Sequence, residues 1–311
     1  MRMPLLALLL ALPLPVLADT TLRVMSFNIW GGGLNDGTGI DATLAAIRAA
    51  APDVIGLQEV CTEGEVCEAD FCPPGPDSVG PALAAALGWH YHEQTGESPA
   101  LWANAVLSRH PITGTAPYDL GVSLDVDGTT VWLLNIHLDD SPYQPYQLLG
   151  IPYGDAPFIT TAAEAVTFAA DTRGAALDLL LDTIGTLGDG PILVTGDFNE
   201  PSALDWTPEA AAAGLHPLAV AWPFTTALMQ AGFTDAYRAI HPDPVAKPAF
   251  TWTPAYPEDA PDDHPDRIDF VFARGATVTD ARIVGETGPR SDIAVDPWPS
   301  DHRAVLAELR F

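Results

Sequence analysis

Short apolar runs that end on polar side chains recur along this chain. Runs of this length, bounded by Gly, Pro, Asn or Asp, are typical of buried β-strands. They occur at residues 22–30, 53–60, 129–140, 191–200 and 266–275. Residues 89–94 and 103–112 also suit strands, and the final run, 302–311, alternates apolar and polar positions. We therefore expect the last segment to close the sheet system.

Helical signals lie between these strands. The predicted helices cover residues 41–50, 77–88 and 161–185. We expect Asp41 to cap the start of the first, Gly88 to end the second and Gly174 to bend the third. Helices and strands are interleaved, but several neighbouring strands have only short connections. This pattern indicates an α/β protein with mixed sheets rather than a purely parallel sheet.

The first 18 residues, MRMPLLALLLALPLPVLA, differ from the rest of the chain. A basic residue near the start, an apolar stretch and small residues before Asp19 predict a secretory signal cleaved after Ala18. The stretch is short and broken by prolines, and no later segment has the length and apolarity of a membrane span. We expect a secreted or periplasmic protein, not inserted in a membrane. The chain has no internal repeat or low-complexity tract, so we expect residues 19–311 to form a single domain.

The charge is strongly acidic, with 41 Asp and Glu against 13 Lys and Arg and a formal net charge of −28. Proteins that grip nucleic acid usually neutralise phosphates with Lys and Arg. The only lysine here is Lys247. A general polyanion-binding surface is therefore disfavoured, whereas a local phosphate site is not.

The three cysteines lie close together in the sequence, at Cys61, Cys67 and Cys72. In an oxidising compartment this spacing favours one disulfide and one spare thiol. A zinc site is the alternative, although the spacing matches no common zinc pattern.

Polar side chains at the ends of the predicted strands form the strongest functional signal. They are Asn28, Glu59, His137, the pair Asp197 and Asn199, and Asp269, and the sequence SDH at 300–302 precedes the last strand. Alternate residues of a strand share a face. Asp197 and Asn199 would therefore point into one crevice, as would Asn135 and His137.

A single polar residue at a strand end has an ordinary explanation, because strands end where the chain meets water. Six such positions, which carry only Asn, Glu, His and Asp, are not accounted for by this explanation and indicate a shared function. Carboxylate and amide oxygens suit a hard cation such as Mg²⁺, with Mn²⁺ also possible. Histidines beside them could hold a phosphate oxygen or transfer protons.

With these motifs the sequence resembles the endonuclease/exonuclease/phosphatase superfamily, whose members have DNase I-like folds. The motifs SFNIW, GLQEV, LNIHLD, TGDFNE, DRIDFVF and PSDHRAV occur in this order from Asn28 to His302. The resemblance implies a four-layered α/β/β/α sandwich with two mixed β-sheets. It also implies a divalent-metal-dependent phosphoric ester hydrolase.

The resemblance further implies a role for each matched residue. Glu59 would be the principal metal carboxylate, Asp301 a second one, and Asn28 would bind the metal or lie next to its ligands. In the predicted catalytic group, Asp197 orients or deprotonates water, and Asn199 holds that water or a phosphate oxygen. His137 is a phosphate-contacting or acid–base histidine. His302 stabilises the transition state, and Asp269 fixes the ring of His302.

Other polar residues are harder to interpret. Arg173 could reach a substrate phosphate or be a solvated helix charge, and Arg267 could face the cleft or pair with Asp263 or Asp266. The remaining histidines have no matching partners in the sequence, which favours surface or packing roles for His90, His92, His110, His216, His241 and His264. The loop at 141–158, with Tyr143, Tyr146, Tyr153 and Phe158, is either a wall or lid over the substrate or a packed surface loop.

The sequence therefore predicts an exported phosphoester hydrolase, and a phosphodiesterase in particular. We expect a monomer acting on a phosphoester whose identity the sequence leaves open. One alternative is an extracellular nuclease acting on DNA or RNA, so nucleic acid remains a possible partner. Another is a non-catalytic binding module on the same fold, which the retention of every predicted metal carboxylate and of His302 disfavours.

Overall fold

The computed structural model describes residues 20–64 and 73–311. The predicted signal segment, Cys67 and Cys72 lie outside the described residues, and Cys61 is a buried free thiol. Within the described ranges, no helix combines the length and the apolar character needed to cross a bilayer.

Strands and helices alternate along the described chain. The strands are β1 (Thr21–Asn28), β2 (Val54–Gln58), β3 (Cys61–Glu63), β4 (Pro74–Ser78), β5 (His90–Gln94), β6 (Asn104–Ser108), β7 (Ile112–Thr115), β8 (Gly121–Val126), β9 (Thr129–His137), β10 (Ile192–Asp197), β11 (Thr234–Asp235), β12 (Asp269–Arg274), β13 (Thr277–Gly285), β14 (Ile293–Ala294) and β15 (Ala304–Arg310). The helices are α1 (Ile40–Ala50), α2 (Gly80–Leu87), α3 (Gln144–Leu149), α4 (Ala162–Thr186), α5 (Pro208–Ala212), α6 (Pro223–Gln230) and α7 (Ala236–Ile240), with a short 3₁₀ turn at Pro117–Asp119.

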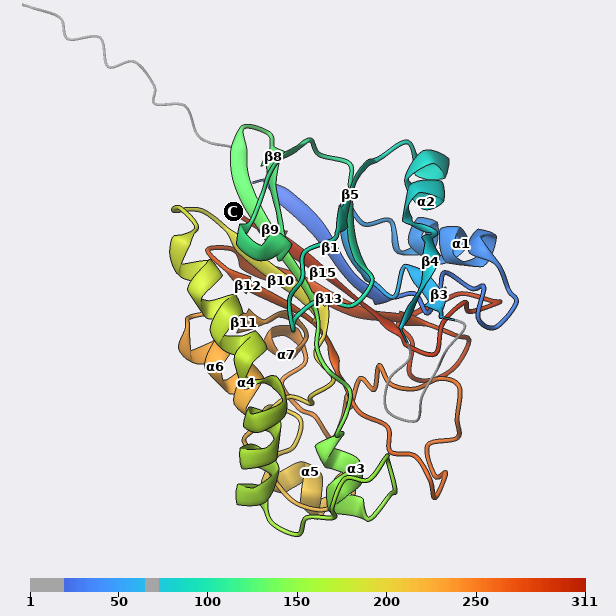
Figure 1. The fold of residues 1–311 in the computed structure, drawn as a ribbon, viewed down its shortest axis with the longest axis vertical. Coiled ribbons are helices and arrows are strands. Elements are labelled where there is room, and N and C mark those ends of the chain that lie inside the picture. Colours follow the sequence, from blue (N-terminus) through green and yellow to red (C-terminus); the bar gives the residue numbers. More distant parts are fainter. Residues whose placement is uncertain (1–19, 65–72) are drawn as a thin grey trace, which may run out of the picture.

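Two large mixed sheets form the centre of the molecule (Figure 1). The seven-stranded sheet has the order β14-β13-β15-β1-β2-β6-β5, and the six-stranded sheet has the order β11-β12-β10-β9-β8-β7. In the first sheet β1 runs parallel to β2 and antiparallel to β15. In the second, β10 runs parallel to β9 and antiparallel to β12. A small third sheet pairs β3 with β4.

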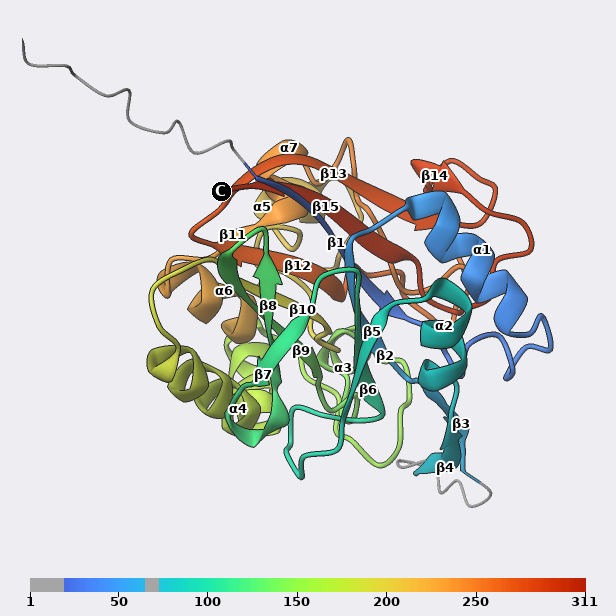
Figure 2. The ribbon, with the colours of Figure 1, turned by 90° about the horizontal axis from the view of Figure 1, so that it is seen from above.

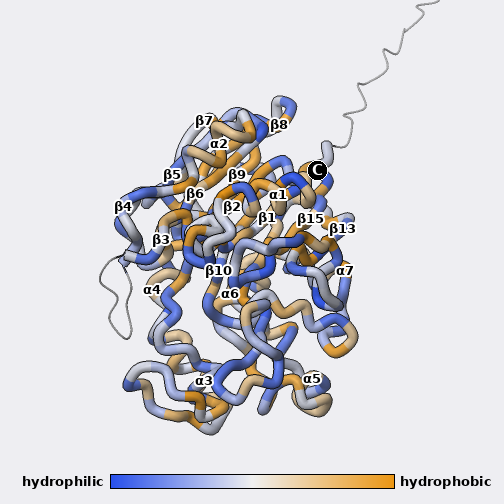
Figure 3. The backbone as a smooth tube through the Cα atoms, turned by 90° about the vertical axis from the view of Figure 1, so that its right-hand side faces the viewer, coloured by the Kyte–Doolittle hydropathy of each residue, from blue (hydrophilic) through white to orange (hydrophobic). Residues whose placement is uncertain are grey.

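Helices cover the outer faces of both sheets, which gives the four-layered α/β/β/α arrangement that the sequence predicts. Helices α1 and α2 lie on one side and α4 and α6 on the other, with the sheets between them (Figure 2). Three apolar layers hold the sandwich together: one under α1 and α2, one between the sheets, and one under α4 and α6. In Figure 3 the strands and helices carry much of the apolar colour and many connections are hydrophilic.

The layer between the sheets changes from apolar to polar along the strands, and this change locates the site. On β1 the inward residues run from Leu22 and Val24 to Ser26 and Asn28. The same change is seen on neighbouring strands, where Val131 and Leu133 precede Asn135 and His137, and Leu193 precedes Thr195 and Asp197. Because Asp197 pairs in register with both His137 and Asp269, the polar ends of three strands meet at one edge.

Buried amides fill the space just behind this edge. The Asn135 amide donates to Leu57 O at 2.8 Å and to Gln94 Oε1 at 2.9 Å, and its Oδ1 accepts from Gln58 Nε2 at 2.6 Å. The expectation that Asn135 opens onto the crevice with His137 is therefore wrong. Gly56 allows the side chains of Thr195 and Asn135 to pack against its backbone, because a Cβ at this position would lie 2.0 Å from Thr195 Oγ1 and 2.4 Å from Asn135 Oδ1.

Several local expectations differ from the structure. Gly39, not Asp41, caps α1, and Asp41 lies in its first turn, where a carboxylate favours the helix dipole. Helix α4 is continuous through Gly174. Residues 103–112 do not form one strand, because the chain turns at His110 and Pro111 and passes from β6 in one sheet to β7 in the other. Residues 77–88 hold the end of β4 as well as α2, which does end at Gly88 as expected.

Candidate active site

Two carboxylates and one amide form the centre of the site. Asn28 Nδ2 donates to Glu59 Oε1 at 2.7 Å and to Asp197 Oδ2 at 3.1 Å, so it bridges the two acids. Asn28 Oδ1 accepts from the backbone N–H of Trp30 at 3.1 Å. Asn28 therefore orients the carboxylates with its nitrogen and has its oxygen fixed by the backbone.

The backbone turns sharply at two of these residues. Glu59 follows the last residue of β2 with a φ of 54°, and Asn199 has a φ of 46°. This left-handed region costs residues other than glycine about 1 kcal/mol or more, and such strain is concentrated at functional sites. The turn at Asn199 is held by its own N–H, which donates to Asp197 Oδ1 at 2.9 Å.

His137 and Asn199 form a pair on one side of Asp197. His137 Nδ1 lies 3.2 Å from Trp102 O, and because a carbonyl can only accept, Nδ1 carries a proton. Nε2 of His137 lies 3.3 Å from Asn199 Nδ2, 3.6 Å from Asp197 Oδ2 and 3.9 Å from Glu59 Oε1. His137 thus directs Nε2 toward both carboxylates.

His302 lies on the other side of Asp197 and is held by a buried acid. Its Nδ1 is 2.9 Å from Asp269 Oδ2, and its Nε2 is 3.6 Å from Asp197 Oδ2. Burial alone would lower the pKa of His302, but the carboxylates of Asp269, Asp197 and Asp301 raise it well above its ordinary value. The arrangement therefore favours an imidazolium.

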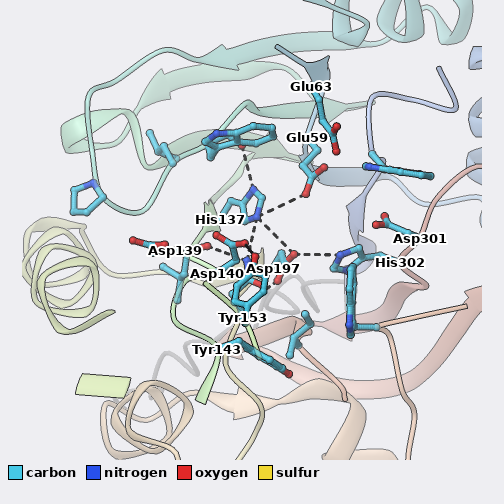
Figure 4. Close-up of a pocket in the computed structure, with 18 of the residues that line it drawn as sticks. Glu59, Glu63, His137, Asp139, Asp140, Tyr143, Tyr153, Asp197, Asp301 and His302 are labelled. Carbon is cyan, nitrogen blue, oxygen red and sulfur yellow. Dashed lines mark hydrogen bonds and ion pairs between the residues drawn. The ribbon is translucent and has the colours of Figure 1, made fainter. Parts of the chain in front are cut away.

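A cavity of about 530 Å³ opens in front of these groups. Six of the predicted residues line it: Glu59, His137, Asp197, Asn199, Asp301 and His302. Figure 4 shows His137 and His302 flanking Asp197, with Glu59 above and Asp301 beside His302. The other two predicted residues, Asn28 and Asp269, lie behind and hold Glu59, Asp197 and His302 through the hydrogen bonds above. The structure thus brings all eight predicted residues together.

The charges of the cavity suit a hard divalent cation. Burial raises the pKa of Glu59 despite its histidine neighbours, and burial raises the pKa of Asp301 to about 7. Asp301 Oδ1 has no hydrogen-bond partner among the described residues. Glu59, Asp197 and His302 also place possible ligand atoms within 4.8 Å of one another. Because an imidazolium cannot bind a metal, Glu59 and the unpartnered Asp301 are the better ligands, and a bound cation would offset their repulsion.

Aromatic side chains form one wall of the cavity, and the sequence pattern identified its three tyrosines but not Trp252. Tyr143, Tyr146 and Tyr153 line the cavity, in agreement with the wall interpretation of the 141–158 loop, whereas Phe158 is exposed. Trp252 also lines the cavity, with its ring 4.8 Å from that of His302. Asp139 and Asp140 line it as well, and their position two and three residues after His137 is a sequence signal for this placement.

Both arginines that the sequence analysis considered are buried, and both interpretations of each were wrong. Arg173 donates to Gln144 Oε1 at 2.6 Å, so it holds α3 against α4. Arg267 pairs with Asp235 at 2.6 Å and with Asp205 at 2.9 Å, instead of Asp263 or Asp266. Neither arginine lines the cavity.

The family follows from comparison with known proteins. A model of the endonuclease/exonuclease/phosphatase family matches residues 25–302. The chain belongs to this family. Members of the endonuclease/exonuclease/phosphatase family are phosphoester hydrolases, usually metal-dependent, and residues 25–302 hold every side chain of the site described above.

Individual relatives agree with the fold of this family. The chain is 28% identical over 321 residues to the uncharacterised protein F14F9.5 of Caenorhabditis elegans, covering 93% of this chain and 91% of that protein. A solved endonuclease/exonuclease/phosphatase from Beutenbergia cavernae has a TM-score of 0.56 at 21% identity, covering 94% of this chain and 72% of that one. The 3′ phosphatase NExo from Neisseria, bound to a product DNA hairpin, has a TM-score of 0.52 at 19% identity, with coverage of 92% and 98%.

Proposed function

We propose that this protein is an exported, divalent-metal-dependent phosphodiesterase that cleaves small phosphodiesters. The observation that carries the proposal is the convergence of Glu59, Asp197, Asp301 and His302 on one cavity, with His302 held by Asp269. Acids and imidazoles in this arrangement suit hydrolysis of a phosphate ester, where charge must be spread over the non-bridging oxygens.

Asp197 is positioned to activate the attacking water. Its Oδ1 accepts the N–H of Asn199 and its Oδ2 accepts Asn28 Nδ2–H, so the carboxylate has little freedom to rotate. It would orient the water and take its proton, while Asn199 holds the water or a phosphate oxygen. The contacts of His137 with Trp102 O and Asn199 fix its ring at the same edge.

His302 is positioned to stabilise the transition state. Asp269 orients its ring and favours its charged form, which would leave Nε2–H free to donate to a non-bridging oxygen as negative charge develops there. Glu59 and Asp301 would hold Mg²⁺, with Mn²⁺ as a substitute. The bound ion would supply Lewis-acid stabilisation of the phosphate and a template for its orientation.

The lining of the cavity favours a small substrate over a long polyanion. Six of its side chains are acidic, Glu59, Glu63, Asp139, Asp140, Asp197 and Asp301, and no Lys or Arg of the described residues lines it. A nucleic-acid strand extending from the site would meet this negative surface without the basic contacts that usually hold phosphates.

A nuclease acting on DNA or RNA is the second candidate, because the structural relative NExo has a DNA hairpin bound. The proposal distinguishes the two: small phosphodiesters should be turned over efficiently, whereas plasmid nicking should be slow and strongly inhibited by salt. Parallel assays with DNA, RNA, sphingomyelin and inositol phosphates would then rank the natural substrate classes.

Hydrolysis of bis-p-nitrophenyl phosphate tests the activity directly. We expect turnover with Mg²⁺ and none in EDTA. Glu59→Gln, Asp197→Asn and His302→Ala should each abolish turnover while the circular dichroism spectrum is unchanged. His90→Gln, at an exposed position of β5, is the matched control and should retain full activity. Near-normal turnover by all three site variants would exclude the mechanism.

Export is the other part of the proposal and has its own test. It is supported by the basic start, apolar stretch and small residues of the first 18 positions. Mass spectrometry of the exported protein should find a mature chain beginning at Asp19. An intact chain retained in the cell would contradict export.

A further inference from the structure

A second group of metal-ligating side chains lies on the far side of the aromatic wall. His216, from the segment between α5 and α6, meets His264 and Asp266, from the segment before β12. His216 Nδ1 is 3.1 Å from His264 Nε2, and the two nitrogens lie 3.8 Å and 4.0 Å from Asp266 Oδ1. Of the surface or packing roles expected for these histidines, the packing role is confirmed, because both rings contact Trp206; the sequence did not indicate that the two would meet each other and Asp266.

The spacing of these three atoms fits a transition-metal ion. A point equidistant from three atoms with these separations lies about 2.1 Å from each, against typical zinc distances of about 2.0–2.2 Å to nitrogen and oxygen. Two imidazoles and one carboxylate form a known zinc donor set, whereas the oxygen donors of the catalytic cavity suit Mg²⁺. The two sites thus differ in the chemistry of their ligands.

The surroundings of Asp266 are those of an oriented metal ligand. Trp206 Nε1 donates to Asp266 Oδ1 and Tyr143 OH donates to Asp266 Oδ2, both at 2.8 Å. Trp206 also stacks on the ring of His216, with centroids 4.4 Å apart. Carboxylates and histidines that bind metals are usually fixed by such partners.

The charge of the cluster is unbalanced without a cation. Asp266 is completely buried, and its ion-pair contacts among the described residues are to His216 and His264. A hydrogen bond between neutral imidazoles would explain the histidine pair. It would leave Asp266 with hydrogen-bond donors but without a positively charged partner among the described residues.

We propose that His216, His264 and Asp266 form a second, non-catalytic metal site that binds Zn²⁺. The ion would join the segment between α5 and α6 to the segment before β12. The second of these segments supports the aromatic wall, because Asp266 accepts from Tyr143 and Asp263 accepts from Tyr146 at 2.5 Å. Zinc would therefore stabilise the wall of the catalytic cavity without touching the reacting atoms.

Metal content measured on the full-length mature protein tests this site. After dialysis with Zn²⁺ in millimolar Mg²⁺, we expect one zinc per chain by plasma mass spectrometry, and an X-ray absorption shell of nitrogen and oxygen. His264→Gln and Asp266→Asn should weaken zinc binding by about 100-fold or more, since even partners that only orient a ligand contribute about 10–100-fold. Zinc should also raise the Tm of the wild type but not of these variants.

Matched variants separate this site from its rivals. His90→Gln, an exposed histidine, and Glu59→Gln, in the catalytic cavity, should both retain the zinc. Cys67→Ser should retain it as well, because the three proposed ligands include no cysteine. Absence of zinc from the wild type, sulfur in the absorption shell, or full retention by both His264→Gln and Asp266→Asn would overturn the proposal. Because zinc content is measured without an activity assay, the zinc site is tested independently of the phosphodiesterase reaction.

Discussion

The pairing of Asp269 with His302 leads to a quantitative prediction. Asp269→Asn removes the negative charge 2.9 Å from His302 Nδ1 and leaves that of Asp197 at 3.6 Å from Nε2. With an effective dielectric constant of about 20, these separations correspond to attractions of about 6 and about 5 kcal/mol. The substitution thus removes slightly more than half of the attraction that these two carboxylates supply, while the cost of burying the imidazolium is unchanged.

We expect a large loss of kcat and a shift of its pH dependence. A loss of about 3–5 kcal/mol of transition-state stabilisation corresponds to a decrease of about 10²–10⁴-fold in kcat. Removal of a negative neighbour destabilises the imidazolium, so the pKa of His302 falls. The alkaline limb of the kcat profile should then move to lower pH.

The assay is hydrolysis of bis-p-nitrophenyl phosphate across pH at saturating Mg²⁺ for both proteins. Asp280→Asn is the control, because it removes a carboxylate from the exposed pair with Arg282. A folded Asp269→Asn protein with kcat within threefold of the wild type and an unshifted profile would refute the role assigned to this pair.

Three other predictions concern stability, metal and substrate. Arg267→Leu should lower the free energy of unfolding by about 3–5 kcal/mol in urea titrations, because it removes the ion-pair partner of buried Asp235 and leaves buried Asp205 with Arg238 alone. Lys247→Gln, from an exposed ion pair, should change it by less than about 1 kcal/mol; equal effects would contradict this. In EDTA the Tm should fall as pH rises from about 5 to about 8. The pKa values of Glu59 and Asp301 are raised in the folded protein, so over this range the folded protein keeps protons that the unfolded chain releases. Mg²⁺ should restore the Tm most at the alkaline end of the range, and a Tm that does not change with pH would argue against buried acids at this site. Tyr146→Ala should change relative rates across a panel of phosphodiesters with little change in Mg²⁺ affinity, and proportionate loss on every substrate would count against a role in selectivity.

The candidate site could be predicted because its residues sit at strand ends. Apolar runs that finish on Asn28, His137 or Asp197 specify both a strand and the edge where it stops. Alternation along the strand then places these side chains on the inner face. The position of Asn135 could not be obtained in this way, because the same face is closed by amides two residues before it opens into the cavity.

Partners that are distant in the sequence could not be predicted. Arg267 has Asp263 and Asp266 close by in the chain, yet it pairs with Asp205 and Asp235. These pairings depend on the path of the loops that connect the sheets and helices. A local sequence pattern does not predict that path. The same holds for His216 and His264, which meet across 48 positions.

Within residues 20–64 and 73–311 the cavity is lined by no Lys or Arg, and this has a thermodynamic consequence. Six carboxylates would oppose the entry of a phosphate dianion or diester, and the single positive charge of His302 would offset only part of that repulsion until Mg²⁺ is bound. The ion in turn would be held more tightly once an anion balanced its charge. By linkage each ligand must tighten the other by the same factor. Calorimetric titration should therefore show strongly synergistic association, with inorganic phosphate binding measurably only to the magnesium-loaded protein.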